Sequence, residues 1–133
     1  MIHEEICTYE VCKLAKYKGF PQDVFGTCEM KSACYLKDGR YYKDGCICPI
    51  ENAYSAPTQS LLQRWLREEK NLYISIIAHA KSKRVYYEWE VRYISALGNM
   101  NKASSVMSIE TYRYNTYELA LEDALKYALE NLV

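Results

Sequence analysis

Residues 71–93 decide the fold, and their sequence is NLYISIIAHAKSKRVYYEWEVRY. In its first half the side chains alternate, with an inward set of Leu72, Ile74, Ile76 and Ala78. After a turn at Lys81-Ser82-Lys83, the second half alternates with Val85, Tyr87, Trp89, Val91 and Tyr93 inward and Tyr86, Glu88, Glu90 and Arg92 outward. A period of two is typical of β-strands with one buried face. The stretch therefore predicts two antiparallel strands joined by a tight turn.

The chain after this hairpin predicts a loop, a strand and a helix. Residues 95–105 are small and polar and predict a loop, followed by a third strand over Val106–Tyr114. Asn115 is the expected cap of the closing helix, and Glu118 follows at capping-box spacing. The apolar stripe of this helix is Tyr117, Leu121, Leu125, Ala128 and Leu132.

Before the hairpin, residues 55–70 predict another helix, beginning near Ser55-Ala56-Pro57-Thr58. Its expected apolar face is Leu61, Leu62, Trp65 and Leu66, and its expected solvent face is Gln59, Gln63, Arg64, Arg67 and Glu68. Arg64 and Glu68 have the spacing of a surface ion pair, and Asn71 is the expected C-cap. Residues 55–133 thus predict an α-β-β-β-α core, with its helices packed on one face of an antiparallel sheet.

Residues 1–54 predict a helix plus an irregular hairpin segment. Thr8 caps a helix that ends near Lys18, and Gly19-Phe20-Pro21 is a strong stop signal. Asp38-Gly39 predicts a two-residue turn that pairs residues 34–36 with 41–43. With a length of 133 residues, we expect one α+β domain over residues 1–133.

The composition bounds the class of protein. Half of the residues are hydrophobic and the formal net charge is zero, which is globular and argues against nonspecific binding to phosphate. A local basic patch is still compatible with that balance. The N-terminus lacks a signal peptide and no apolar run approaches membrane-spanning length, so we expect a cytoplasmic protein with no membrane partner and with reduced cysteines.

Four of the six cysteines fall in the irregular segment, namely Cys28, Cys34, Cys46 and Cys48. Four thiolates on neighbouring loops can hold zinc, although the spacing lacks the usual two Cys-x2-4-Cys knuckles. The alternative, which we favour, is that they are small buried hydrophobic residues, so no metal is expected. Cys7 and Cys12 are expected on a helix face.

The sequence gives no catalytic constellation. The two histidines are His3, near the N-terminus, and His79, at a strand end, and His79 could activate a serine or cysteine only if the fold happened to bring one beside it. No glycine-rich phosphate loop is present. We therefore expect a protein that is not an enzyme and that takes no cofactor.

Lys81, Lys83 and Arg84 form the one basic cluster, with tyrosines close by. The helix-strand-strand-strand-helix order resembles the topology of double-stranded-RNA-binding domains, which use a basic loop and a basic start to the last helix. Here the last helix begins with Asn115-Thr116-Tyr117-Glu118 and continues with Glu122 and Asp123, which would repel phosphate. Nucleic acid is therefore an alternative partner, contacted through Lys81, Lys83 and Arg84.

Three segments resemble small uncharacterised proteins of gut bacteria, their phages and prophages. They are SAPTQSLLQRWLRE at 55–68, YELALEDAL at 117–125 and the opening helix at 8–20. The resemblance implies no activity and transfers no site residues. It favours a noncatalytic accessory protein that binds a protein partner of unknown identity, which the 14 tyrosines also suit. Exposed sheet edges and zero net charge favour a homodimer.

Overall fold

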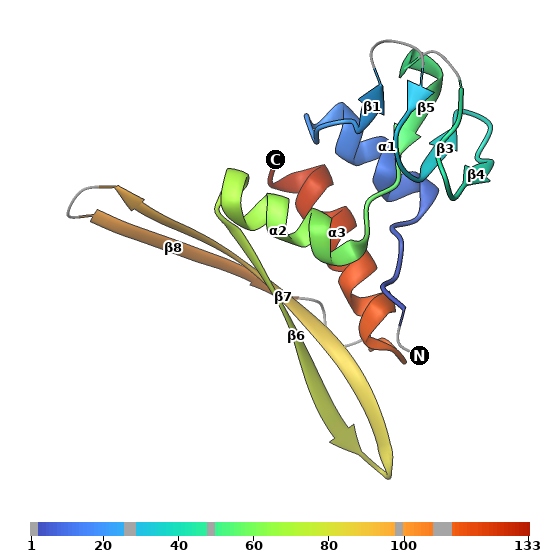
Figure 1. Ribbon diagram of the computed structural model, residues 1–133. Coiled ribbons are helices and arrows are strands. Elements are labelled where there is room, and N and C mark those ends of the chain that lie inside the picture. Colours follow the sequence, from blue (N-terminus) through green and yellow to red (C-terminus); the bar gives the residue numbers. More distant parts are fainter. Residues whose placement is uncertain (1–2, 26–28, 48–49, 98–99, 108–112) are drawn as a thin grey trace. The chain divides into compact units, whose positions relative to one another are not determined.

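A computed structural model describes residues 3–25, 29–47, 50–97, 100–107 and 113–133 (Figure 1). This part of the chain contains three α-helices and three small antiparallel sheets, which confirms the α+β class. It divides into two compact units, Met1–Thr58 and Gln59–Val133. The division lies a few residues after the boundary at 54 and 55 that the sequence suggests, and a single domain over the whole chain stays a prediction.

Helix α1, Tyr9–Tyr17, opens the first unit with the predicted caps. The hydroxyl of Thr8 accepts a hydrogen bond from the backbone N–H of Val11 at 3.4 Å, as an N-cap threonine does. Gly19 follows with a φ of +99°, and the N–H of Phe20 donates to the carbonyl of Ala15. The glycine therefore turns the chain back over the end of the helix. The buried face consists of Val11, Cys12 and Ala15.

A three-stranded sheet forms the rest of the core of this unit. Strand β3, Cys34–Leu36, lies between β4, Tyr41–Tyr42, and β5, Ala53–Ser55. Strand β5 shows that a helix start at Ser55 was wrong. The Ser55 hydroxyl accepts a hydrogen bond from the N–H of Asp23, and the Ser55 N–H donates to Oε1 of Gln22. The remaining elements are the pair β1, Val24–Phe25, and β2, Glu29–Met30, and the 3-10 turn Ile50–Asn52.

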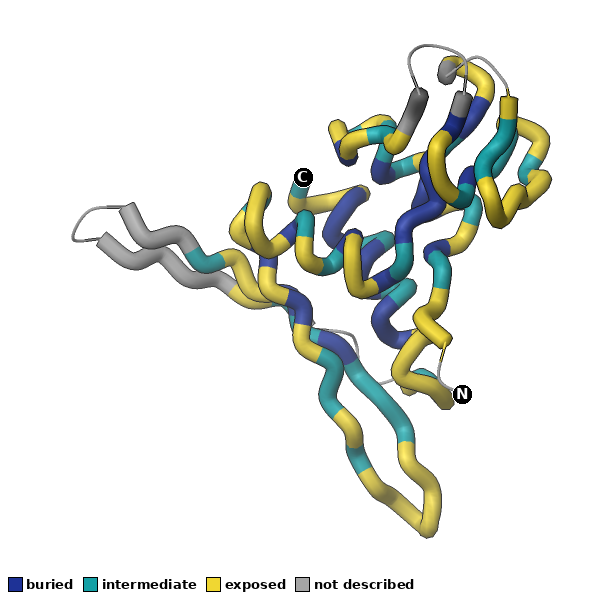
Figure 2. Tube along the Cα trace, viewed as in Figure 1, coloured by how far each residue is buried: buried dark blue, intermediate teal, exposed yellow. Residues whose placement is uncertain are grey.

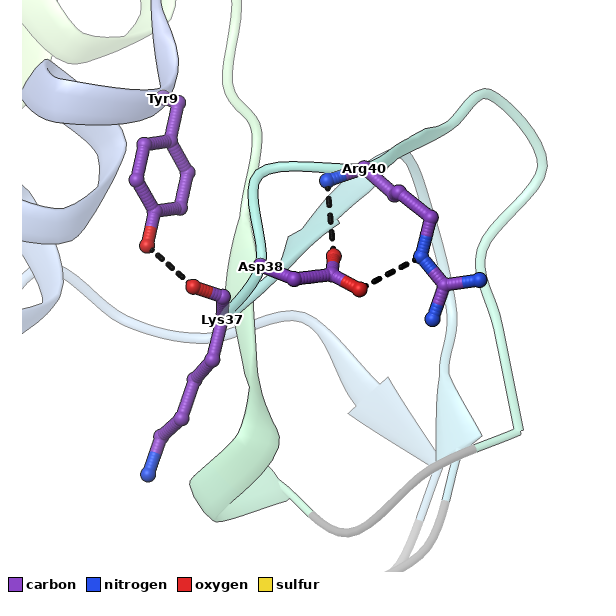
Figure 3. Close-up of polar contacts among 4 residues, drawn as sticks. All are labelled: Tyr9, Lys37, Asp38 and Arg40. Carbon is purple, nitrogen blue, oxygen red and sulfur yellow. Dashed lines mark hydrogen bonds and ion pairs between the residues drawn. The ribbon is translucent and has the colours of Figure 1, made fainter.

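The turn between β3 and β4 contains three residues, so the predicted two-residue turn was wrong. The N–H of Leu36 donates to the carbonyl of Arg40 at 2.8 Å, and only Gly39 has a positive φ, of +91°. Asp38 instead accepts bonds from the backbone N–H of Arg40 at 3.0 Å and from its Nε at 2.7 Å (Figure 3). The Arg40 backbone N–H, followed by its guanidinium, lowers the pKa of the Asp38 carboxyl. This local bonding keeps Asp38 out of the left-handed region that a two-residue turn would require.

In the second unit, β6, Leu72–Lys81, and β7, Arg84–Leu97, form the predicted hairpin. Leu72 lies opposite Tyr93 and Lys81 opposite Arg84. The buried residues of this hairpin are Leu72, Ile74, Trp89 and Val91, all on the predicted inward face. Burial is confined to the half of the hairpin nearest the helices, since Val85 on the same face is 57% exposed. The other half therefore leaves the core.

The third strand lies earlier than predicted. Strand β8, Met100–Met107, pairs with the extended end of β7, so Leu97 lies opposite Met100 and Glu90 opposite Met107. Of the predicted loop over residues 95–105, residues 95–97 and 100–105 are strand instead, because pairing between β7 and β8 outweighs the weak strand propensity of small residues, and residues 98–99 lie outside the described residues. Of the predicted strand Val106–Tyr114, residues 108–112 lie outside the described residues. Tyr114 forms an isolated antiparallel bridge with Tyr87.

Helix α3, Tyr117–Asn131, closes the chain and is capped by Thr116. The Thr116 hydroxyl accepts from the N–H of Leu119 at 3.1 Å, so the prediction of Asn115 as the cap was wrong by one residue. Thr116 has the extended backbone that a cap requires, with φ of −132° and ψ of 154°. The buried face is Ala120, Leu121, Ala124, Leu125, Ala128 and Leu129. This face packs on β6 and β7.

Helix α2, Gln59–Lys70, contacts β6 and α3 and buries Leu62 and Leu66. The predicted pair of Arg64 Nε and Glu68 Oε1 is present at 2.9 Å. Asn71 has the left-handed φ of +58° that suits a C-cap. The buried face of the sheet is the one that α2 and α3 cover, as predicted.

Two residues of α2 were assigned to the wrong face. Leu61 is exposed, whereas Gln59 is buried. The Gln59 Nε2 donates to the carbonyl of Glu118 at 3.0 Å and to Glu122 Oε2 at 2.8 Å. A buried amide is tolerated where its hydrogen bonds are satisfied, and the first two turns of α3 provide both acceptors.

In the part of the chain that the structure describes, no helix has the length and apolar character needed to cross a bilayer.

Candidate nucleic-acid interface

The predicted basic residues Lys81, Lys83 and Arg84 lie together at the tip of the β6–β7 hairpin. Lys81 and Arg84 face each other across the strands, and Ser82 and Lys83 form the turn between them. All four are exposed, and Figure 2 shows this end of the hairpin as a continuous exposed segment. We call Lys81, Lys83, Arg84 and the nearby Arg113 the basic tip.

The backbone of the turn is strained. Ser82 and Lys83 both have left-handed φ values, of +53° and +64°. A two-residue hairpin turn of this kind favours Asn-Gly or Asp-Gly, because residues with larger side chains disfavour positive φ. A lysine in this position costs about 1 kcal/mol relative to an unstrained backbone. The backbone geometry of the turn would therefore favour glycine over lysine at position 83.

Arg113 reaches the tip from a distant part of the sequence. The bridge between Tyr87 and Tyr114 holds its segment beside β7, with two backbone hydrogen bonds of 2.8 Å and 3.0 Å. The Arg113 guanidinium lies over the Tyr86 ring, with Cζ 4.6 Å from the ring centroid. This distance is typical of a cation–π contact.

A shallow pocket of about 240 Å³ opens beside this contact. Its lining includes Lys81, Ser82, Arg84, Tyr86, Arg113 and Asn115. Three of these side chains are cationic, and the serine hydroxyl and asparagine amide can both donate hydrogen bonds. The chemistry of the lining therefore suits an anion with several acceptor oxygens, such as a phosphate group.

His79 and Glu88 complete the same face of the hairpin. His79 lies opposite Tyr86 in the sheet, and their rings stack with centroids 5.1 Å apart and planes 14° apart. His79 Nε2 lies 3.1 Å from Glu88 Oε2, although the approach is not aligned as a hydrogen bond. The Glu88 side chain is 13% exposed. Among the described residues, Glu88 is thus a carboxylate of this face that lies beside a histidine.

The three cations of the β6–β7 turn differ from Glu88 in this respect. Among the described residues, no salt bridge involves Lys81, Lys83 or Arg84. The next carboxylate along β7, Glu90, pairs with Arg92 at 3.4 Å. The basic tip therefore presents its charges to solvent, where they attract an anionic partner.

A hydrogen-bonded cluster anchors the segment that carries Arg113. Trp89 Nε1 donates to Asp123 Oδ2 at 3.0 Å, and the Tyr114 hydroxyl forms a short hydrogen bond with the same oxygen. Asp123 belongs to α3, so the cluster joins β7, the 113–114 segment and the helix. It fixes the position of Arg113 from within the second unit.

The predicted cysteine site is only partly within the described residues. Cys34 and Cys46 come together, with their sulfur atoms 2.9 Å apart, whereas Cys28 and Cys48 lie outside the description. Within the described ranges, no group of three or more histidine, cysteine or acidic side chains could hold a metal ion. The zinc hypothesis, which involves all four cysteines, therefore stays a prediction.

Sequence reasoning found three members of the basic tip and missed Arg113. The segment TYRYNTY at 111–117 places one cation among tyrosines, but it does not show that Tyr114 pairs with Tyr87. Tyr86 and His79 were assigned separately to an outward strand face and a strand end. Only the cross-strand register shows that they stack.

Comparison with models of known protein families gives no match, and neither do comparisons with curated proteins and with solved structures. The assignment of a function therefore depends on the geometry of the basic tip.

Proposed function

We propose that the protein is a noncatalytic binding protein that contacts the phosphate backbone of duplex DNA through the basic tip. The supporting observation is the meeting of Lys81, Arg84 and Arg113 around a pocket with several hydrogen-bond donors, with the exposed Lys83 in the adjoining turn. Lysine and arginine contacts to phosphate supply most of the affinity in nonspecific nucleic-acid binding. They also fix the orientation of the protein on the duplex.

The shape of the site favours duplex DNA over single strands. The major groove of B-DNA admits a two-stranded β-ribbon, and the exposed half of the β6–β7 hairpin is such a ribbon. Binding to single strands relies on open aromatic faces on which bases stack. The Tyr86 ring is already engaged by His79 and Arg113. It is therefore not offered as a platform for a base.

The charge distribution limits the mode of binding. The chain has no net charge, so attraction must come from the local field of the tip. The first turns of α3 carry Glu118, Glu122 and Asp123, which repel phosphate. Contact through the start of the last helix, as in double-stranded-RNA-binding domains, is therefore unfavourable here.

Neutralising the tip is expected to remove DNA binding. In the triple variant Lys81→Ala, Lys83→Ala and Arg84→Ala, the affinity for a fluorescein-labelled 20-base-pair duplex should fall by about two orders of magnitude, since each charged contact contributes about 1 kcal/mol or more. The slope of log affinity against log salt concentration should become less steep by about 2.7, because each of the three lost phosphate contacts contributes about 0.9 to it. Fluorescence anisotropy over a salt series measures both quantities.

A charge-matched variant controls for the change in net charge. Lys13, Lys43 and Arg67 are exposed and lie outside the basic tip, so Lys13→Ala, Lys43→Ala and Arg67→Ala together remove the same charge. Binding of this control should stay within about threefold of the wild type. Equal losses in the two triple variants, or no binding by the wild type at low salt, would contradict the proposal.

Replacing Lys83 by glycine should separate binding from stability. Glycine adopts the φ of +64° without strain, so the free energy of unfolding should stay level or rise by about 0.5 kcal/mol. DNA affinity should nevertheless fall, because one cation of the tip is lost. Urea unfolding followed by tryptophan fluorescence and anisotropy on the same samples test this. A loss of both stability and affinity would show that Lys83 serves the fold.

Protein binding is the second candidate, as an accessory protein of phage or mobile-element type. Exposed apolar side chains in the first unit support it, including Tyr17 at 85% and Ile47 at 84% exposure, together with Tyr41 and Tyr42 of β4. Exposed aromatic residues are enriched at protein interfaces. A bacterial protein that the wild type captures and that Tyr41→Ser with Ile47→Ser does not would favour this candidate. Capture that depends on the tip cations and on DNA would favour the first.

A further inference from the structure

A histidine lies next to the basic tip, on the same face of the hairpin. His79 pairs with Tyr86 across the strands, and the next pair toward the turn on that face is Lys81 with Arg84. Residues two positions apart in a strand point to the same side and lie about 7 Å apart. A phosphate group held beside Lys81 is therefore close enough to the histidine ring for their charges to interact, since the Debye length is about 8 Å at physiological ionic strength.

Two neighbours fix the orientation of the His79 ring. The ring is stacked on that of Tyr86, with the two planes 14° apart. This orientation places Nε2, which is buried, 3.1 Å from Glu88 Oε2. The Glu88 side chain is 13% exposed, so solvent and salt screen the two groups less than they screen a pair on the open surface. The charge state of the ring therefore matters to the field on this face.

The charged and titratable groups around the ring come from three segments. Lys81 is on the same strand, β6. Strand β7 contributes Arg84, Tyr86 and Glu88. Arg113 comes from the segment that precedes α3, and its guanidinium lies over the Tyr86 ring on which His79 is stacked. Of these groups, the Glu88 carboxylate is the one that opposes the approach of phosphate.

We infer that protonation of His79 strengthens the binding of duplex DNA by the basic tip, an inference that rests on the function proposed above. Histidine is the side chain whose charge ordinarily changes between about pH 5 and pH 8. A neutral ring leaves the pair of His79 and Glu88 with a net negative charge. A protonated ring adds a positive charge and makes the pair neutral. Protonation thus removes a repulsion that phosphate at the tip would otherwise meet.

The same coupling predicts that DNA brings protons onto the protein. Two ligands that favour each other must each raise the affinity of the other by the same factor. Here the two ligands are the proton on His79 and the phosphate backbone at the tip. The protein should therefore take up protons from the buffer when it binds the duplex near neutral pH.

The test compares the affinity for a rhodamine-labelled duplex at about pH 5.5 and about pH 8, at the same low ionic strength. The wild type should bind about three- to tenfold more tightly at the lower pH, as expected for unit charges about 7 Å apart at a protein surface. His79→Gln should reduce this ratio to less than about twofold. The matched control is His3→Gln, which removes the other histidine of the chain and should retain the wild-type ratio.

Glu88→Gln separates the charge of the carboxylate from the titration of the ring. It should raise the affinity at about pH 8 toward the value that the wild type reaches at about pH 5.5. Isothermal titration calorimetry in two buffers with different ionisation enthalpies measures the proton uptake. The uptake should be present in the wild type and in His3→Gln, and it should be smaller in His79→Gln.

Two results would overturn this inference alone. One is DNA binding by the wild type that does not change with pH, and the other is a pH dependence that His79→Gln leaves unchanged. The NMR signals of the His79 ring in the wild type give a check that needs no variant and no DNA, since a ring that does not titrate over this pH range would also exclude the mechanism. Absence of DNA binding at both pH values would instead overturn the proposed function together with this inference.

Discussion

Replacement of Gly45 by alanine is expected to lower the free energy of unfolding of the first unit by about 3–5 kcal/mol. A Cβ at this position would lie 2.1 Å from the carbonyl oxygen of Met30 and 3.2 Å from that of Ser32. Both obstacles are backbone atoms, so no side chain can rotate away. Gly45 also has a φ of +87°, which disfavours any residue with a Cβ. Relief of the clash would require breaking the Met30 to Cys46 hydrogen bond.

Amide hydrogen exchange in increasing denaturant is the suitable measurement, read at Met30 and Leu36. Tryptophan fluorescence would not report on this unit, since Trp65 and Trp89 both lie in the second one.

Gly39 provides the matched control for this substitution. Its φ of +91° resembles that of Gly45, but nothing lies within 4 Å of a Cβ built on it. Gly39→Ala should therefore cost only the backbone strain, about 1 kcal/mol. If the two alanine variants lose the same stability, the close approach to Met30 does not determine the role of Gly45.

Replacement of Leu125 by alanine is expected to cost the second unit about 3–4 kcal/mol. Leu125 is fully buried in the face of α3 that packs on β6 and β7. Truncation removes apolar contact area and leaves a cavity, because helix and sheet backbones relax only in part. Urea unfolding followed by fluorescence of Trp65 and Trp89 measures the loss.

Leu119 is the control on the same helix, since it is 55% exposed. Leu119→Ala should change the free energy of unfolding by about 0.5 kcal/mol or less. A loss at Leu125 as small as that at Leu119 would show that this face of α3 is not the core of the unit.

The elements with strong local signals were predictable from the sequence. The alternation from Leu72 to Tyr93 determines both a strand pair and its buried face, and Thr8 and Gly19 mark the ends of α1. The errors arose where a partner in space decides the outcome. Residues 100–107 have little strand propensity, and they form β8 because β7 extends far enough to pair with them. Gln59 resembles a solvent-facing residue until the acceptors of α3 are known.

The site was predictable in part for the same reason. Lys81, Lys83 and Arg84 are neighbours in sequence, so their clustering needs only the turn. Arg113 joins them through the Tyr87–Tyr114 bridge, and that contact has no signal in a single sequence. The contact between Cys34 and Cys46 likewise depends on where Met30 holds the Cys46 segment. The roles of these residues in binding stay predictions.

The position of β6 at the margin of its sheet has a consequence for solubility. Strand β6 pairs with β7 alone among the described strands, so its other side offers backbone groups to a further strand. Near the start of β6, Gln63 Nε2 donates a hydrogen bond of 3.0 Å to the carbonyl of Ile74, so this carbonyl already has a partner within the chain. At its far end, Lys81 places a charge where a second copy would add, and charged residues on such strands oppose self-aggregation. The predicted homodimer, formed along this margin, would have to place the charge of Lys81 against the edge of a second copy, and removal of Lys81 should make the protein more prone to fibrillar assembly.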